Sequence, residues 1–149
     1  MLLLANVASA TTPTVFNFTR DAPSGCISNT KQNSEPCPSA TSPGWWTGGG
    51  GGSKSPFAFT WVAEGETKSP GTGPSNGVGG SGPYMYAEAN APRAPGNSFR
   101  LYYDGSACPD SGEGVSSVTF YYHMYGSNMG KLLVTNAAGE ELWSLSGDQ

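Results

Sequence analysis

The chain has 149 residues, a formal net charge of -4 and only 12% charged residues, so it lacks the basic surface that binds nucleic acid or anionic membranes. Glycine (22) and proline (12) are frequent, while six Phe, seven Tyr and four Trp supply the apolar bulk. Because aromatic side chains bury large areas and favour strands, this composition predicts one all-β domain with long loops rich in Gly, Pro and Ser.

The first ten residues, MLLLANVASA, combine an apolar run with Ala8-Ser9-Ala10, a small-residue pattern typical of signal-peptidase sites. The run is too short to span a membrane. We interpret residues 1–10 as the remnant of a secretion signal and residues 11–149 as one domain. The alternative is an N-terminal segment that is disordered or partly docked. The first interpretation places the mature chain in an oxidising compartment.

Three cysteines are present, and two of them lie in the loop-like segment CISNTKQNSEPC. We predict a disulfide between Cys26 and Cys37, which would stabilise this short loop by roughly 3 kcal/mol. Cys108 is then left over, and we expect its partner elsewhere. The sequence has no CxxC pair or Cys/His cluster, which argues against a zinc site.

Short apolar runs recur between breaks rich in Gly, Pro and Ser, the pattern of an all-β sandwich or barrel. Residues 20–56 are expected to be irregular, and the glycines at 48–52 lack the context of a phosphate loop. GSNMG predicts a five-residue hairpin connection, and NAAG predicts a turn before the last strand. Strands are expected over residues 15–19, 57–62, 84–89, 98–103, 118–125, 131–135 and 141–145.

His123 is the only histidine, which limits the catalytic arrangements that the chain could form. No nucleophile-elbow or protease motif surrounds it. Alternation along residues 118–125 places it on the face of Thr119, Tyr121 and Tyr125, so we interpret it as a packed residue, with a reactive group as the alternative. The carboxylates form no pair of the glycosidase type. The sequence therefore predicts no enzymatic activity.

Two features of the sequence are compatible with a bound calcium ion or with N-glycosylation. Asp104, Asp110 and Glu113 share a loop, and Glu88 ends an expected strand, but their spacing is not that of an EF-hand. Solvated acids are the simpler interpretation, with calcium as the alternative. Asn17-Phe18-Thr19 is an N-glycosylation sequon, and strand alternation points Asn17 outward.

Four segments carry a resemblance to a known family: VFNFT, the run FTWVAEGETKSPGTGPSNGVGGSGPYMYAEA, the stretch FYYHMYGSNMGKL and the final LLVTNAAGEELWSLSGDQ. They resemble the MAM domain, an extracellular adhesion and assembly module of meprin-type proteases, neuropilin-type receptors and receptor tyrosine phosphatases. The third segment is similar to the signature FWYHMYG-x-x-[MI]-G-x-L, with Tyr121 in place of the usual tryptophan.

This resemblance implies an antiparallel β-sandwich of jelly-roll type that acts in protein–protein recognition or adhesion. The module would belong to a larger secreted or membrane-anchored protein, bind a protein partner, homophilic contact included, and neither bind nucleic acid nor insert into a membrane. The signature residues would then be part of the core: Phe120, Tyr122, His123, Met124, Tyr125, Gly126 and Gly130.

The chain also departs from the family pattern. Family domains usually continue beyond the G-x-Q run with further strands and a last cysteine, so we expect a domain that is incomplete at its C-terminus, with apolar surface uncovered. Thr19 and the Asn76-Gly77-Val78 run replace family positions linked to cation binding, which argues against an inherited calcium site. The family cysteine corresponds to Ser117 rather than to Cys108.

Trp45 and Trp46 are the candidate contact residues, because exposed aromatic side chains are typical of recognition surfaces. The alternative is that both tryptophans fold back over the edge of the core. Two other functions stay open. One is a carbohydrate-binding jelly roll, in which tryptophan and tyrosine rings stack on sugars. The other is an accessory domain of a secreted protease.

Overall fold

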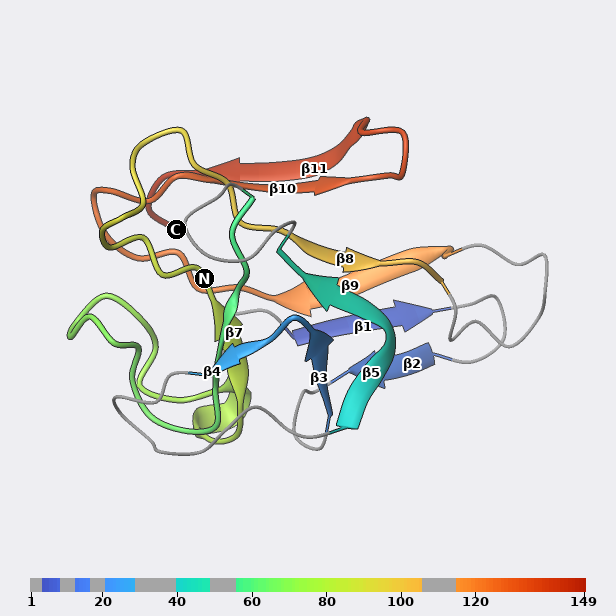
Figure 1. Cartoon of the computed structure of the whole chain (residues 1–149), viewed down its shortest axis with the longest axis horizontal. Helices are drawn as coiled ribbons and strands as arrows, with labels where there is room; N and C mark the ends of the chain where they lie inside the picture. Colours follow the sequence, from blue (N-terminus) through green and yellow to red (C-terminus); the bar gives the residue numbers. More distant parts are fainter. Residues whose placement is uncertain (1–3, 9–12, 17–20, 29–39, 49–55, 106–114) are drawn as a thin grey trace.

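The computed structural model describes residues 4–8, 13–16, 21–28, 40–48, 56–105 and 115–149, and these residues are almost entirely strands and connecting loops (Figure 1). The one helical element within them is a single 3-10 turn, η1 (Val78–Gly80). The prediction of an all-β fold is confirmed. The strands are β1 (Leu4–Ala8), β2 (Pro13–Phe16), β3 (Asp21–Ser24), β4 (Ile27–Ser28), β5 (Ala40–Thr47), β6 (Thr60–Val62), β7 (Tyr84–Tyr86), β8 (Leu101–Tyr103), β9 (Ser117–Tyr121), β10 (Lys131–Thr135) and β11 (Glu141–Ser146).

These strands form four small sheets, with the orders β2–β1–β9, β3–β5–β8, β4–β6–β7 and β10–β11. Most pairings are antiparallel, which is consistent with a β-sandwich. Two pairings, β3 with β5 and β4 with β6, are parallel. A parallel pair needs a crossover of a dozen residues or more, and the chain between β3 and β5 is long enough to supply one.

The strand β5 corrects the prediction that residues 20–56 are irregular. Its sequence, ATSPGWWT, contains a Pro-Gly pair that normally marks a break. Gly44 accordingly has a φ of 73°, a backbone conformation that favours glycine. Beyond this irregularity, Trp45, Trp46 and Thr47 form a regular antiparallel ladder with β8. Pairing with a distant strand therefore overrides the local turn signal.

The N-terminal segment is also part of a sheet. β1 pairs with β2 on one side and with β9 on the other, so it is the central strand of its sheet. A segment removed during secretion could not supply this strand to the mature fold. The interpretation of residues 1–10 as a secretion signal stays a prediction, and it competes with the sheet position of β1.

The predicted hairpin at GSNMG is wrong. β9 pairs with β1, and β10 pairs with β11, so the strands on either side of this connection lie in different sheets. The strand β9 ends at Tyr121, four residues before the expected end. The turn at Asn136–Gly139 is confirmed. Its Asn136 side chain accepts hydrogen bonds from the backbone of Ala138 and Glu140, both at 3.0 Å.

The core is built around the antiparallel pair β6–β7, which is buried on both faces. On one face Trp61 lies opposite Met85, and both pack with Trp45 and Phe59. On the other face Val62, Tyr84 and Tyr86 form a second buried cluster, against which Val78 packs. Phe57, Phe59 and Trp61 are all buried, with exposed fractions of 3%, 4% and 3%.

The segment around GTGP covers the second cluster. The phenol of Tyr84, fully buried, donates to the carbonyl oxygen of Gly65 at 2.7 Å and approaches that of Pro74 at 3.4 Å. Gly73 lies so close to Thr67 that a Cβ atom would come within 2.4 Å of the threonine methyl group. Burial raises the pKa of Tyr86 to about 12, so its phenol stays neutral at physiological pH.

A buried threonine hydroxyl connects three segments of the core. Thr47 is 6% exposed, and its Oγ1 accepts a hydrogen bond from the backbone N–H of Phe59 at 2.7 Å. The same hydroxyl donates to the carbonyl oxygen of Arg100 at 2.9 Å. The side chain of Thr47 therefore supplies a hydrogen-bond partner to a backbone N–H just before β6 and to a backbone carbonyl just before β8.

We expect Thr47→Val to lower the free energy of unfolding by about 1–3 kcal/mol, because the buried N–H of Phe59 would lose its partner. Thr47→Ser keeps the hydroxyl and is the matched control, with a smaller loss. Urea denaturation of the three proteins measures the difference. Equal stability of the valine and serine variants would show that the hydroxyl is dispensable.

Removal of residues 1–10 tests the position of β1. If β1 is the central strand, the shortened chain loses the backbone hydrogen bonds to both neighbours, and we expect at least about 3 kcal/mol of destabilisation or a failure to fold. Thermal unfolding of the two purified chains measures this. A shortened chain as stable as the full one would instead support the secretion-signal interpretation.

Candidate interaction surface

The segment with the family signature begins in β9 and continues into the following loop. Phe120 is half-buried and Met124 is 3% exposed, whereas Tyr122 and Tyr125 are 41% and 58% exposed. The expectation of core positions is thereby corrected for these two tyrosines. β9 is an edge strand that ends at Tyr121, so the regular alternation does not reach Tyr125.

An aromatic cluster connects this segment to the C-terminal hairpin β10–β11. The ring of Trp143 lies 5.3 Å from that of Phe120, at an interplanar angle of 80°, and 5.9 Å from that of Tyr122. The rings of Phe120 and Tyr122 are 6.4 Å apart. Edge-to-face arrangements of this kind are favourable for aromatic pairs. Because Tyr122 and Trp143 also reach solvent, the cluster contributes to the surface as well as to packing.

The loop after β9 is fastened to the last residues of the chain. Gly126 has a φ of 113° and donates its backbone N–H to Asp148 Oδ1 at 2.9 Å. The N–H of Gln149 donates to the carbonyl oxygen of Met124 at 2.8 Å. The carbonyl of Gly130 also accepts a backbone hydrogen bond from this terminal segment, at 3.1 Å. Gly130 is exposed, so the expectation of a core position is corrected for it as well. Both signature glycines take part in backbone hydrogen bonds that hold this loop against the chain end.

His123 lies in the same loop, partly buried, with its ring centroid 6.3 Å from that of Tyr125. Its Nδ1 is buried and has no hydrogen-bond partner within the described ranges. Desolvation lowers the pKa of the imidazole, which favours the neutral form. A catalytic histidine needs a nucleophile or substrate group within reach and a residue that orients it. The interpretation of His123 as a packed residue fits this geometry better than a reactive role.

The two adjacent tryptophans have different surroundings. Trp45 is 6% exposed and packs in the core at 4.9 Å from the ring of Tyr103, so the proposed contact role is corrected for this residue. Trp46 is 38% exposed and stacks on Tyr102, with ring centroids 5.0 Å apart and an interplanar angle of 10°. Of these two tryptophans, Trp46 alone remains a candidate contact residue.

Several predicted sites fall outside the described residues. Cys26 is disulfide-bonded, but Cys37 and Cys108 are both outside these ranges, so the Cys26–Cys37 pairing stays a prediction. The same holds for glycosylation at Asn17 and for two acids of the calcium candidate, Asp110 and Glu113.

Glu88, the strand acid of the calcium candidate, is 7% exposed and has partners of its own. Its carboxylate accepts hydrogen bonds from the Tyr86 phenol at 3.3 Å and from the Asn90 backbone at 3.2 Å. Across the parts of the chain that the structure describes, no three His, Cys, Asp or Glu residues gather as metal ligands would. In those parts no helix is long and apolar enough to cross a membrane.

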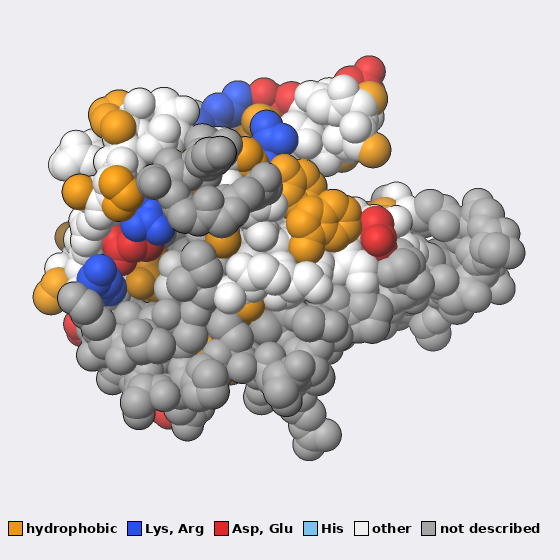
Figure 2. All heavy atoms as spheres, viewed as in Figure 1, with side chains coloured by type: hydrophobic (Ala, Val, Ile, Leu, Met, Phe, Trp, Pro, Cys, Tyr) orange, Lys and Arg blue, Asp and Glu red, His pale blue; other side chains and the backbone are white. Residues whose placement is uncertain are grey.

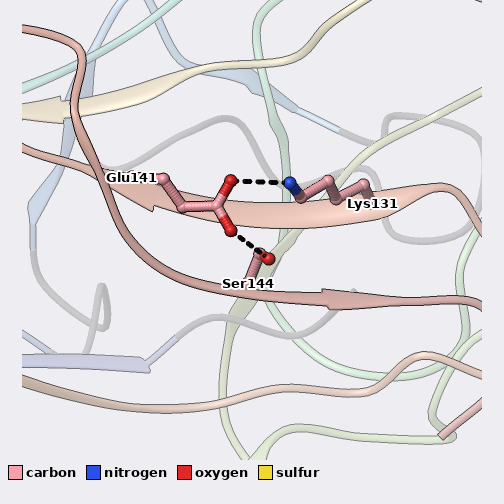
Figure 3. A network of polar contacts seen from close by, with 3 residues as sticks. All are labelled: Lys131, Glu141 and Ser144. Carbon is pink, nitrogen blue, oxygen red and sulfur yellow. Dashed lines mark hydrogen bonds and ion pairs between the residues drawn. The ribbon is translucent and has the colours of Figure 1, made fainter.

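The outer side of the hairpin mixes apolar and charged groups. Leu133 and Leu142 are 45% and 64% exposed. Near them the Lys131 ammonium lies 2.7 Å from one carboxylate oxygen of Glu141, and the Ser144 hydroxyl donates to the other at 2.5 Å (Figure 3). The hydrogen bond from Lys131, and to a smaller extent the one from Ser144, lowers the pKa of the Glu141 carboxyl. On the face shown in Figure 2, further hydrophobic side chains gather over β8, below this hairpin.

Similarity to known proteins covers part of this chain. MAM domain-containing glycosylphosphatidylinositol anchor protein 1 of Gallus gallus is 36% identical over 86 residues, which are 52% of the chain and 9% of that protein. The protein of the same name in Homo sapiens is 34% identical over 104 residues, or 61% of the chain and 11% of that protein. In Rattus norvegicus the corresponding identity is 32% over 104 residues.

The chain thus spans about a tenth of the length of the curated relatives it matches. No family model matches it, and no solved structure gives a significant match. The similarity to the curated proteins supports a MAM domain, in agreement with the motifs. The relatives are named for a lipid anchor and not for an enzymatic activity.

Asp148→Ala tests the fastening of the signature loop. We expect the free energy of unfolding to fall by about 1 kcal/mol, because an exposed charge-assisted hydrogen bond is lost. Amide exchange at Gly126 should accelerate, which hydrogen-exchange NMR measures. Asp148→Asn retains an acceptor oxygen and is the control. Unchanged exchange at Gly126 in the alanine variant would contradict the role of Asp148.

Proposed function

We propose that this chain is a non-catalytic extracellular recognition module, part of a larger membrane-anchored or secreted protein, and that its partner is another protein. The observation that carries the proposal is the distribution of exposed apolar side chains. Of the nine large hydrophobic residues exposed within the described ranges, eight lie between Val115 and Trp143. Monomeric proteins rarely gather so much apolar surface in one region without a binding role.

We call this part the β9–hairpin region: the two residues before β9, β9 itself, the loop after it and the hairpin β10–β11. Its composition suits protein recognition, because tyrosine and tryptophan are enriched in protein interfaces while charged residues are depleted at their centres. Tyr121, Tyr125 and Leu142 are the members with more than half of their surface exposed, at 57%, 58% and 64%.

The curated relatives support the extracellular part of the proposal. Their name describes a glycosylphosphatidylinositol anchor, a feature of proteins on the outer cell surface. The disulfide at Cys26 suits the same oxidising environment. A carbohydrate ligand and an accessory role beside a secreted protease are the competing functions, and the following experiment separates the first of them from protein binding.

The test is binding of the chain, multimerised through a fused coiled coil, to a panel of intact cells. We expect saturable staining that is lost after proteolysis of the cell surface. The triple variant Tyr121→Ser, Tyr125→Ser, Leu142→Ser should bind at least about tenfold more weakly, because interface aromatics dominate binding energy. Pro70→Ser, an exposed apolar residue outside the β9–hairpin region, is the control.

Each outcome is informative. Staining that survives proteolysis but is lost after glycosidase treatment would assign the function to carbohydrate binding. Staining that is unchanged in the triple variant would remove the β9–hairpin region from the contact. Hydrolytic activity of the purified chain, lost in His123→Ala, would contradict the non-catalytic assignment.

A further inference from the structure

A second aromatic group, the exposed Trp46 with the half-buried Tyr102, lies outside the β9–hairpin region, on the outer face of the sheet β3–β5–β8. Trp46 of β5 lies directly opposite Tyr102 of β8, and the neighbouring pair is Trp45 with Tyr103. Successive strand residues point to opposite faces. Because Trp45 is buried in the core, Trp46 and Tyr102 are on the face that points away from it.

Arg100 extends this aromatic pair along the strand. It is two residues before Tyr102, so its side chain is on the same face, and its Nη1 donates to the Tyr102 hydroxyl at 3.3 Å. The backbone N–H of Gly48 donates to the Arg100 carbonyl at 3.0 Å, which places a residue without a side chain opposite the arginine. Arg100 is exposed. We call Trp46, Tyr102 and Arg100 the Trp46 platform.

We propose that the Trp46 platform anchors an extended segment of a partner protein that carries an apolar side chain and, two residues away, a carboxylate. The inference rests on the proposed function and names the chemistry of the partner. The apolar side chain would pack against the paired rings, and the carboxylate would bind Arg100. Side chains two residues apart in an extended segment are separated by roughly 6.6–6.8 Å, and Arg100, just before β8, is likewise two residues from Tyr102.

The residue types of the platform support this partner. Tryptophan, tyrosine and arginine are the three types most enriched among the residues that dominate protein binding energies. A guanidinium group has five N–H donors, and the Tyr102 hydroxyl occupies one of them. The remaining donors can bind a carboxylate in the bidentate geometry that makes arginine selective for this group.

A protein segment fits the platform better than a sugar or a nucleic acid does. The stacked rings of Trp46 and Tyr102 each cover one face of the other, which reduces the flat surface open to a pyranose ring. The net charge of -4 disfavours a polyanion such as nucleic acid, whereas one carboxylate requires only one local cation.

The experiment selects phage-displayed random 12-residue peptides on the full chain and removes those that also bind the Arg100→Glu chain. We expect a consensus with an acid two residues from a large apolar residue. A synthetic peptide of this consensus should bind Arg100→Glu and Trp46→Ala about 30-fold more weakly, the loss typical of a dominant contact. Lys68→Gln changes an exposed cation outside both the β9–hairpin region and the Trp46 platform and is the control, with affinity within about twofold of wild type.

A double-mutant cycle tests whether the carboxylate of the peptide binds Arg100 directly. Replacing the peptide acid by glutamine should weaken binding to the wild-type chain and should have little further effect on the Arg100→Gln chain. Circular dichroism and thermal unfolding check that each variant is folded, and Arg100→Gln, an exposed substitution, stays informative if Trp46→Ala is destabilised.

Three results would overturn the inference: a consensus without an acid, equal binding of the peptide to Arg100→Glu, or binding to a glycan array that depends on Trp46. The cell-binding experiment separates this failure from that of the proposed function. Protease-sensitive staining that persists in Arg100→Glu with Trp46→Ala leaves the recognition function in place and removes the platform from it. Wild-type staining that is insensitive to proteolysis contradicts the recognition of a protein itself.

Discussion

The burial of β6–β7 on both faces is the constraint on which the rest of the fold depends. A two-stranded ribbon with Trp61 and Met85 on one side and Val62 and Tyr84 on the other needs cover from two directions. The β5–β8 ladder supplies one cover with Trp45. The segment around GTGP supplies the other, and the buried Tyr84 phenol holds it through the carbonyl oxygens of Gly65 and Pro74. The packing of apolar side chains and the hydrogen bonding of the buried phenol thus both require this segment to cover β6–β7.

The parts of the fold that could be predicted from sequence are those with local causes. β10 and β11 follow from alternation on both sides of a turn whose Asn136 side chain organises its own neighbours. The strand β5 could not be predicted in this way, because its ladder joins Trp46 to Tyr102, far along the chain. Burial of β9 depends equally on which strands flank it, and the sequence of the segment does not contain this information.

The residues of the candidate surfaces also divide into those whose exposure follows from local alternation and those whose exposure depends on distant parts of the chain. Once a strand is assumed at GWWT, alternation alone requires that Trp45 and Trp46 face opposite ways, so the difference between them was accessible from sequence. The signature tyrosines are different, since FYYHMYG indicates the family without indicating which rings are covered. Exposure of Tyr122 and Tyr125 arises where the strand ends and the loop after β9 is held by Asp148.

The ion pair between Lys131 and Glu141 has a consequence beyond the hairpin itself. An exposed pair adds little to folding stability, and salt screens it further. Within the described part of the chain, however, β10 and β11 each have one unpaired edge, next to the exposed Leu133 and Leu142. Charged side chains over such edges hinder the addition of another strand. We therefore expect the pair to oppose the joining of sheets between neighbouring molecules more than it stabilises the hairpin, and this effect should weaken as ionic strength rises.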